Sequence, residues 1–179
     1  MFLLTCSVAN ADVIFAVHGG EERREEFDWL GVTLGGHIDE FSEEATVPNW
    51  LRKWTDHPKV GISLEVTVAQ IDHESLTKER YDYSIIPKLS YYLAKYLYVR
   101  GGLGVGYNEL EKEDTEDNDL KLGGRMFFAP EFNIGLEAHV GNTKPYVELT
   151  YTHRSNLGLG DSDNNQSLNY FLANVGIRF

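Results

Sequence analysis

The sequence contains a single cysteine, Cys6, and no apolar run close to the roughly 18 residues that a membrane-spanning helix requires. One cysteine can form neither a disulfide framework nor a cysteine-based metal site within one chain. Basic residues are also few, since 16 Lys and Arg stand against 28 Asp and Glu and give a net charge of -12. Phosphate binding needs concentrated Lys and Arg, so no nucleic acid partner is expected. If the protein lies in a membrane, it must cross it with strands.

The first eleven residues resemble the end of a secretory signal. A short apolar run is followed by Ala9-Asn10-Ala11, the small-x-small pattern that signal peptidase accepts. We therefore expect residues 1–11 to be a signal peptide remnant, with the natural start further upstream, and residues 12–179 to form one domain. The competing interpretation, a lipid anchor on Cys6, is disfavoured because Thr5 is not the small residue that lipoprotein processing prefers.

Alternation of apolar and polar residues dominates the sequence from Asp12 onward, and hardly any helical period is present. In the clearest segment the residues on one face are all apolar and those between them are Gly, Ser, Glu and Thr; the apolar ones are Val60, Ile62, Leu64, Val66 and Val68. Such a period of two is typical of a strand with two unlike faces. Eight strands are predicted, near residues 12–19, 28–36, 59–70, 82–93, 96–108, 126–140, 145–155 and 169–179.

The polar faces of these strands distinguish a membrane barrel from a soluble sandwich. They combine glycines with isolated charges of both signs, namely Glu65, Lys88, Arg100, Glu137 and Glu148. Glycine admits bulky neighbours and opposite charges can pair, so these faces suit the interior of a narrow barrel. The apolar faces would then contact lipid. The sequence therefore predicts an all-β fold, an eight-stranded antiparallel transmembrane β-barrel.

The last strand and the connections agree with an outer-membrane barrel. Apolar residues occupy every second position up to the terminal aromatic, as in the signal read by the outer-membrane assembly machinery; they are Phe171, Ala173, Val175, Ile177 and Phe179. Connections expected outside the cell are longer and more polar than those expected in the periplasm. The exception is 37–58, a long predicted periplasmic connection whose Trp50 and Trp54 would anchor at the interface or pack against the barrel base.

The seventh predicted strand carries the residues best suited to chemistry. His153 and Ser155 continue the lipid-facing row that begins with Val147 and Leu149. Residues two apart on a strand project the same way, so an imidazole nitrogen could take the proton of the serine hydroxyl. Polar residues are also common where strands reach the membrane interface, so the pair alone does not identify an enzyme. The six histidines show no metal-ligand spacing, and no metal site is expected.

Several segments resemble PagL-type lipid A 3-O-deacylases. The most specific is the His-x-Ser-Asn signature, present here as His153 to Asn156 within YTHRSNLGLG. The final segment NYFLANVGIRF and two upstream segments, SIIPKLSYYLAKYLYVRGGLGVGYNE and FFAPEFNIGLEAHV, are also similar to strands of that family. The resemblance covers about the last 100 residues. It implies Ser155 as nucleophile, His153 as general base and Asn156 as an oxyanion donor.

The sequence departs from the family at the third catalytic residue. The family uses an acidic residue near the start of the last strand to orient the histidine, and the corresponding position here is Asn169. An amide can accept a hydrogen bond from histidine and fix its tautomer, but it stabilises imidazolium less than a carboxylate does. Asp161 and Asp163, in the preceding loop, are the alternatives for this role.

The resemblance implies an outer-membrane enzyme that hydrolyses the ester holding the 3-hydroxyacyl chain at the 3 position of lipid A, without any cofactor. Its partners would be lipid A or lipopolysaccharide and outer-membrane lipids, and a homodimer is one alternative for its assembly. The main rival is a non-catalytic structural or adhesive barrel that has lost the catalytic acid. A soluble lipid-binding β-barrel is the third interpretation.

Overall fold

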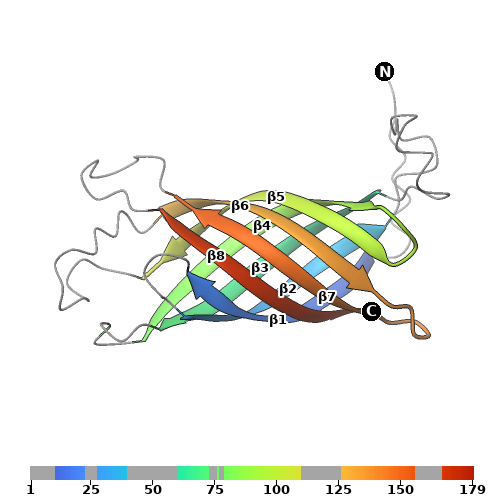
Figure 1. Cartoon of the computed structure of the whole chain (residues 1–179), viewed down its shortest axis with the longest axis horizontal. Helices are drawn as coiled ribbons and strands as arrows, with labels where there is room; N and C mark the ends of the chain where they lie inside the picture. Colours follow the sequence, from blue (N-terminus) through green and yellow to red (C-terminus); the bar gives the residue numbers. More distant parts are fainter. Residues whose placement is uncertain are drawn as a thin grey trace, which may run out of the picture.

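The structure, a computed structural model, describes residues 11–22, 28–39, 60–72, 76, 79–109, 126–155 and 167–179. These residues form eight strands: β1 (Ala11–Glu22), β2 (Asp28–Asp39), β3 (Val60–Asp72), β4 (Arg80–Tyr92), β5 (Leu97–Asn108), β6 (Met126–Glu137), β7 (Lys144–Arg154) and β8 (Leu168–Arg178). Each strand pairs antiparallel with the next, and β8 closes the barrel by pairing with β1. The predicted eight-stranded antiparallel barrel is thereby confirmed (Figure 1). In the described part of the chain, no helix is long and apolar enough to cross a membrane.

Strand boundaries differ from the predicted ones because main-chain pairing, rather than the alternation of side chains, decides where each strand ends. β1 runs on to Glu22 because Gly20 and Glu21 still have partners on β2. β2 likewise reaches Asp39, so the long connection expected at 37–58 starts later, and its Trp50 and Trp54 lie outside the described residues. β6 ends early because Val140 pairs with Thr143 across a tight turn. The predicted signal peptide remnant also falls outside the described residues, except for Ala11, the first residue of β1.

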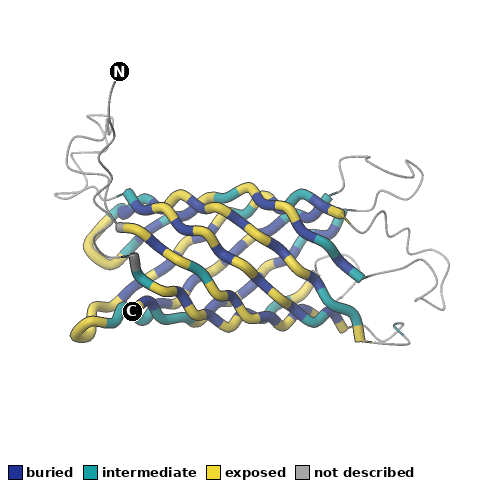
Figure 2. The backbone as a smooth tube through the Cα atoms, turned by 180° about the vertical axis from the view of Figure 1, so that it is seen from behind, coloured by how far each residue is buried: buried dark blue, intermediate teal, exposed yellow. Residues whose placement is uncertain are grey.

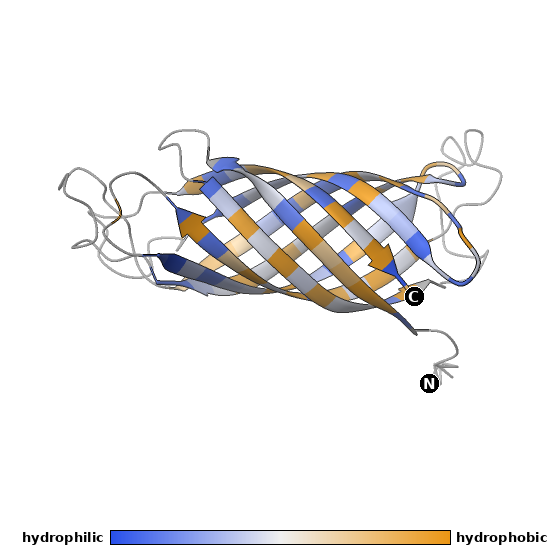
Figure 3. Cartoon of the chain, turned by 90° about the horizontal axis from the view of Figure 1, so that it is seen from below, coloured by the Kyte–Doolittle hydropathy of each residue, from blue (hydrophilic) through white to orange (hydrophobic). Residues whose placement is uncertain are grey.

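The two faces of every strand meet different surroundings. Buried and exposed residues alternate along the strands (Figure 2). Side chains on a strand point alternately to its two faces, so every second side chain is directed into the barrel. The exposed set includes large apolar side chains on all eight strands, among them Leu30, Leu64, Leu103, Leu149 and Val175. Apolar and polar residues therefore alternate around the barrel wall (Figure 3). An apolar outer surface of this kind is stable against lipid chains rather than water.

Ion pairs fill the middle of the barrel. Arg100 donates from Nε and Nη2 to Glu148 over 2.8 Å and from Nη1 to Glu65 over 2.5 Å. Lys88 lies 2.8 Å from Glu65 and 2.7 Å from Glu131. A buried charge is strongly unfavourable unless it is paired, so these contacts make a charged interior compatible with folding. The prediction that interior charges of opposite sign pair is confirmed.

Aromatic rings lie against glycines on neighbouring strands. Tyr98 faces Gly135 and Tyr146 faces Gly176 in the pairing register. A Cβ atom at Gly135 would meet the Tyr98 ring at 2.5 Å, and one at Gly176 would meet the Tyr146 ring at 2.4 Å. Any larger residue would therefore collide with the ring. The inward glycines serve close packing across the barrel interior.

The barrel has two unlike ends. β1 begins and β8 ends at the same end, where Val13 and Phe179 exchange main-chain hydrogen bonds of 2.8 and 3.1 Å (Figure 1). Because neighbouring strands are antiparallel, β7 ends and β8 begins at the opposite end. The candidate site lies there. In outer-membrane barrels the end opposite the termini is the extracellular one.

Candidate active site

The inward neighbours of His153 hold the end of β7 in place. Thr152 and Arg154 are buried, and the Arg154 guanidinium forms an ion pair with Asp82 of β4. The same guanidinium lies over three aromatic rings, 4.8 Å from the centroid of Phe127, 5.4 Å from that of Trp29 and 5.6 Å from that of Tyr170. Since side chains alternate along a strand, burying Arg154 directs His153 and Ser155 to the outside.

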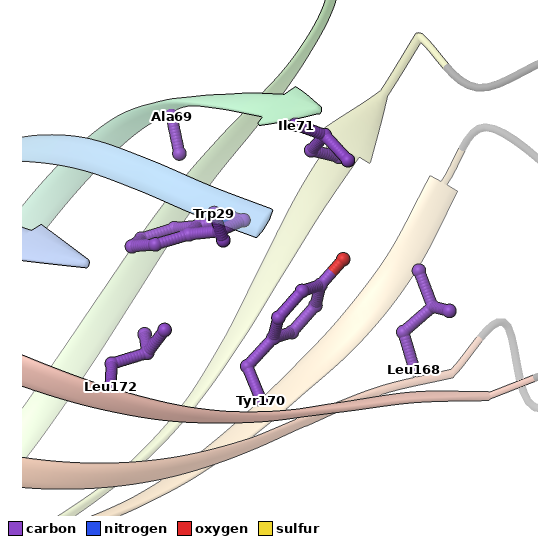
Figure 4. Packing of buried hydrophobic residues seen from close by; sticks show 6 residues of the cluster. All are labelled: Trp29, Ala69, Ile71, Leu168, Tyr170 and Leu172. Carbon is purple, nitrogen blue, oxygen red and sulfur yellow. The ribbon is translucent and has the colours of Figure 1, made fainter. Parts of the chain in front are cut away.

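The start of β8 is fixed in the same way. Leu168 and Tyr170 are buried in an apolar cluster that also contains Trp29, Ala69, Ile71 and Leu172 (Figure 4). Asn169 stands between these two inward residues and is therefore directed outward. In the register of β7 and β8, Asn169 is the direct partner of His153. The inward contacts of the two strands meet, because Arg154 of β7 lies over Trp29 and Tyr170 of this cluster, and they bring an imidazole and an amide together on the outer surface.

His153 and Asn169 are joined by a side-chain hydrogen bond. The Nδ1 atom of His153 lies 2.8 Å from the side-chain oxygen of Asn169. A carbonyl oxygen can only accept, so the proton of this bond belongs to His153 Nδ1. In a neutral imidazole, Nε2 then carries the free electron pair and is the basic nitrogen. This is the tautomer that a general base acting on a serine hydroxyl needs.

A second donor reaches the same amide oxygen. The Tyr151 hydroxyl donates to the side-chain oxygen of Asn169 over 2.8 Å. In the register, Tyr151 is opposite Phe171, so Asn169 is its diagonal neighbour. The Tyr151 and Phe171 rings also contact each other, with centroids 5.2 Å apart. Tyr151, Asn169 and His153 therefore form one connected outward row.

Ser155 directly follows β7 and is tied to β6. Its main-chain N–H donates to the Phe128 carbonyl over 3.1 Å, and its own carbonyl accepts from the Phe128 N–H over 2.7 Å. Alternation places Ser155 on the outer face with His153, their Cα atoms about 6.6 Å apart at the usual rise of a strand. Both side chains are half-buried. From these positions the His153 imidazole and the Ser155 hydroxyl can approach each other.

Pro130 interrupts the main-chain ladder beside His153. N–H groups two residues apart on a strand point to the same side, so the Phe128 bond to Ser155 places the Pro130 nitrogen toward β7. Proline has no N–H to donate there. The continuous pairing of β6 with β7 accordingly ends at Glu131 opposite Thr152, and it resumes only at Ser155. This part of β7 is therefore held by its continuous pairing with β8 and by the inward contacts of Arg154.

Apolar side chains surround the outward row on its membrane side. Phe132 of β6 and Phe171 of β8 flank Tyr151 in the register and are 55% and 56% exposed. In a membrane these rings contact acyl chains, whereas His153 and Ser155 lie nearer the barrel end. Polar side chains therefore lie directly beside an apolar surface that can bind acyl chains.

The structure brings together two of the residues predicted for catalysis, His153 and Asn169, and sets Ser155 on the same face. Asn156, the predicted oxyanion donor, and the alternative acids Asp161 and Asp163 lie outside the described residues. The hydrogen bond from Tyr151 to Asn169 was not predicted. Its only sequence signal was the position of Tyr151 two residues before His153 on the same face.

Other parts of the described chain offer less to chemistry. A hollow at the same end of the barrel is formed by residues of β1, β2 and β3, namely Gly20, Glu21, Asp28, Trp29, Leu30, Gln70 and Asp72. None of the outward row of β7 and β8 lines it. No group of three His, Cys, Asp or Glu side chains among the described residues is placed to hold a metal ion.

The family model of PagL, the lipid A 3-O-deacylase, matches residues 41–178 of this chain. The chain belongs to the PagL family. The match extends well beyond the last 100 residues that carry the resemblance in sequence motifs. None of the curated proteins compared with the chain matches it. PagL membership, the closed barrel and its apolar outer surface together identify an outer-membrane β-barrel.

Two solved structures share the fold of this PagL family member. One is the crystal structure of the outer membrane enzyme PagL, with a TM-score of 0.64 and 15% identity over 91% of this chain and 97% of that chain. The other is the outer membrane protein Ail of Yersinia pestis in a phospholipid bilayer nanodisc, with a TM-score of 0.54 and 12% identity over 95% of this chain and 100% of that chain. At these identities the likeness concerns the barrel architecture alone.

Proposed function

We propose that this protein is a lipid A 3-O-deacylase that hydrolyses the ester of the 3-hydroxyacyl chain at the 3 position of lipid A by a serine mechanism without a cofactor. The observation that carries the proposal is the 2.8 Å hydrogen bond from His153 Nδ1 to Asn169, which leaves His153 Nε2 as the base. Ser155 lies on the same outward face, and membership of the PagL family supplies the substrate class.

The reaction follows from these roles. As the Ser155 Oγ atom attacks the ester carbonyl carbon, His153 Nε2 takes its proton, and the carbonyl oxygen becomes an oxyanion to which Asn156 donates. The intermediate then collapses, the bond to the sugar oxygen breaks and the imidazolium returns the proton to that oxygen. Water activated by His153 next attacks the acyl-enzyme and releases the 3-hydroxy fatty acid. Atoms and protons balance without any further reactant.

The outward position of the site suits a substrate that is itself part of the membrane. The apolar outer surface both anchors the barrel and contacts lipid, and Phe132 and Phe171 lie just below the polar row. Lipid A diffusing in the leaflet would bring its sugar to the barrel end and its acyl chains against these rings. No cleft across the barrel is required for such a substrate.

One feature favours a second candidate, a non-catalytic barrel. Asn169 carries no charge, so it stabilises the imidazolium formed during the reaction less than the acidic residue typical of the family would. A protein that kept the fold but no longer hydrolysed lipid A would retain the same barrel and the same outer surface. Measuring lipid A directly separates the two candidates.

The test is mass spectrometry of lipid A from Gram-negative cells that express this chain behind an intact secretory signal. We expect the loss of one 3-hydroxyacyl chain. Ser155→Ala and His153→Ala should each reduce this loss by about 10³-fold or more, because nucleophile and base act as a unit. Unchanged lipid A from a folded wild-type barrel would instead establish the non-catalytic candidate.

Thr152→Val is the matched control. Thr152 adjoins His153 on β7, but its side chain points inward, is 0% exposed and has no hydrogen-bond partner for its hydroxyl among the described residues. Replacing it by the isosteric valine removes a hydroxyl from the same strand without touching the outward row. This variant should deacylate lipid A like the wild type, with all variants first shown to be folded by heat-modifiable migration in detergent gels.

A further inference from the structure

We infer that Tyr151 is a positioning residue that, through Asn169, sets the tautomer of His153. The inference rests on the proposed function for its effect on catalysis, although its structural part can be measured without activity. Two donors, the Tyr151 hydroxyl and the Nδ1–H of His153, bind the side-chain oxygen of Asn169, each over 2.8 Å. Asn169, held by Tyr151, thereby orients the His153 imidazole as a carboxylate does in an ordinary catalytic triad.

An amide has an ambiguity that a carboxylate lacks. Either end of a carboxylate accepts hydrogen bonds, whereas an amide presents an accepting oxygen on one side and a donating NH₂ group on the other. If the NH₂ group of Asn169 faced His153, the imidazole Nδ1 would have to accept. The proton would then reside on Nε2, and that nitrogen could no longer take the proton of Ser155. A histidine oriented by asparagine therefore needs something to fix the amide.

Tyr151 favours the productive orientation because a phenol is a better hydrogen-bond donor than acceptor. Its oxygen shares electron density with the ring, so its O–H seeks an oxygen more strongly than its lone pairs seek an N–H. The phenol is itself held in place, since its ring packs against Phe171. Tyr151 is also 39% exposed on a lipid-facing wall, where an unpaired hydroxyl is disfavoured. The amide oxygen is thus drawn toward the tyrosine and the histidine together.

The test combines Tyr151→Phe with Asn169→Asp, singly and together. Phenylalanine keeps the ring contact with Phe171 and removes only the hydroxyl. Aspartate has two accepting oxygens, so it should hold the Nδ1–H tautomer of His153 whether or not Tyr151 is present. The control is Tyr83→Phe. Tyr83 is another outward tyrosine at the same barrel end, it is also 39% exposed, and its hydroxyl donates to Glu109 over 3.2 Å.

The first readout is the ¹⁵N chemical shifts of the His153 ring in the full chain in detergent micelles, recorded where the imidazole is neutral and assigned by their loss in His153→Gln. We expect a protonated Nδ1 and an unprotonated Nε2 in the wild type and in Tyr83→Phe. Tyr151→Phe should give a mixture of tautomers. In the Asn169→Asp background the Nδ1–H form should persist with or without Tyr151→Phe.

The second readout is deacylation of lipid A in mixed micelles. Tyr151→Phe should lower kcat about 3- to 10-fold with KM unchanged, the effect of losing one neutral hydrogen bond. In the Asn169→Asp background the same substitution should change kcat less than about 2-fold, because the amide ambiguity is gone. Tyr83→Phe should leave both constants unchanged.

The outcomes separate this inference from the proposed function. An unaltered tautomer in Tyr151→Phe overturns the inference even if the enzyme is active. An equal fall of kcat in both backgrounds does the same, since it would mean that the hydroxyl acts on the substrate or on folding. If no variant hydrolyses lipid A but the tautomer depends on Tyr151 as described, the inference stands and the proposed function fails.

Discussion

Side chains on the inner and outer faces of β7 differ in how far their contacts reach. On the inner face, Glu148 accepts hydrogen bonds from Arg100 of β5, Asn133 of β6 and Asn174 of β8. On the outer face, His153 is bonded to Asn169 on the adjacent strand. Inner residues thus connect strands across the barrel, whereas the outer row joins immediate neighbours. The fold therefore depends on the inner face of β7, and the proposed chemistry depends on the outer face.

We expect the greatest loss of stability when Arg154, the inner neighbour of His153 on β7, is replaced. Arg154→Met leaves Asp82 buried without its guanidinium partner, and the free energy of unfolding should fall by about 3–5 kcal/mol. Deacylation per folded molecule should stay within about threefold of wild type, because the pairing of β7 with β8 still places His153 opposite Asn169. Urea unfolding in lipid vesicles, followed by tryptophan fluorescence, measures the first quantity.

Adding Asp82→Leu to Arg154→Met is the control for that experiment. It removes the orphaned carboxylate, and well-packed apolar side chains can replace a buried ion pair with little loss of stability. Most of the lost free energy should return. Activity that fell in parallel with stability in the single variant would show that pairing with β8 is not enough to position the outer row without Arg154, and the two faces would then not be separable.

A charge on the outer face should act through the membrane. Leu149 lies at the middle of β7 and is 65% exposed, so it faces the centre of the bilayer. Leu149→Arg should destabilise the inserted barrel by about 2–4 kcal/mol, the cost of an arginine at the bilayer midplane. Refolding titrations in vesicles check this, with Leu149→Ala as a size control. An equal loss for both variants would mean that packing, rather than lipid contact, limits stability there.

A smaller effect comes from the inner face where a ring covers a glycine. Gly176→Ala places a Cβ atom 2.4 Å from the Tyr146 ring, so the free energy of unfolding should fall by about 1–3 kcal/mol. The matched variant is Gly36→Ala on the outer face of β2, where a Cβ atom meets nothing within 4 Å. That change should stay within about 0.5 kcal/mol of zero. Similar values for both glycines would contradict the close packing of the interior.

Much of the fold could be predicted because side chains alternate along a strand with a period of two. In a narrow membrane barrel, each side chain faces either the packed interior or the lipid. The alternation alone predicts that Arg154 points inward and that His153 and Ser155 point outward, as the structure has them. The strand ends were less predictable, since the ladder of β1 and β2 continues through residues such as Gly20 and Gly36 that carry no alternation signal. Hydrogen bonds of the main chain, rather than side chains, decide those boundaries.

Pairing between particular side chains could not be predicted, because it depends on register. The sequence indicated that interior charges pair, but not that Lys88 would meet Glu131 or that Arg154 would meet Asp82. The same holds for the outer row. Only the register of β7 with β8, which is set across a connection whose shape alternation does not encode, places Asn169 opposite His153 and within reach of Tyr151.

Replacing His153 on the outer face should change stability very little while it removes the activity. His153→Ala removes a half-buried outward side chain whose partner lies on the adjacent strand, so the free energy of unfolding should stay within about 0.5 kcal/mol of wild type. The same substitution should abolish lipid A deacylation. Urea unfolding in vesicles and lipid A mass spectrometry on one preparation measure both quantities. A loss of several kcal/mol would mean that the outer row also holds the barrel together, because β7 near Pro130 would then depend on His153 as well as on Arg154.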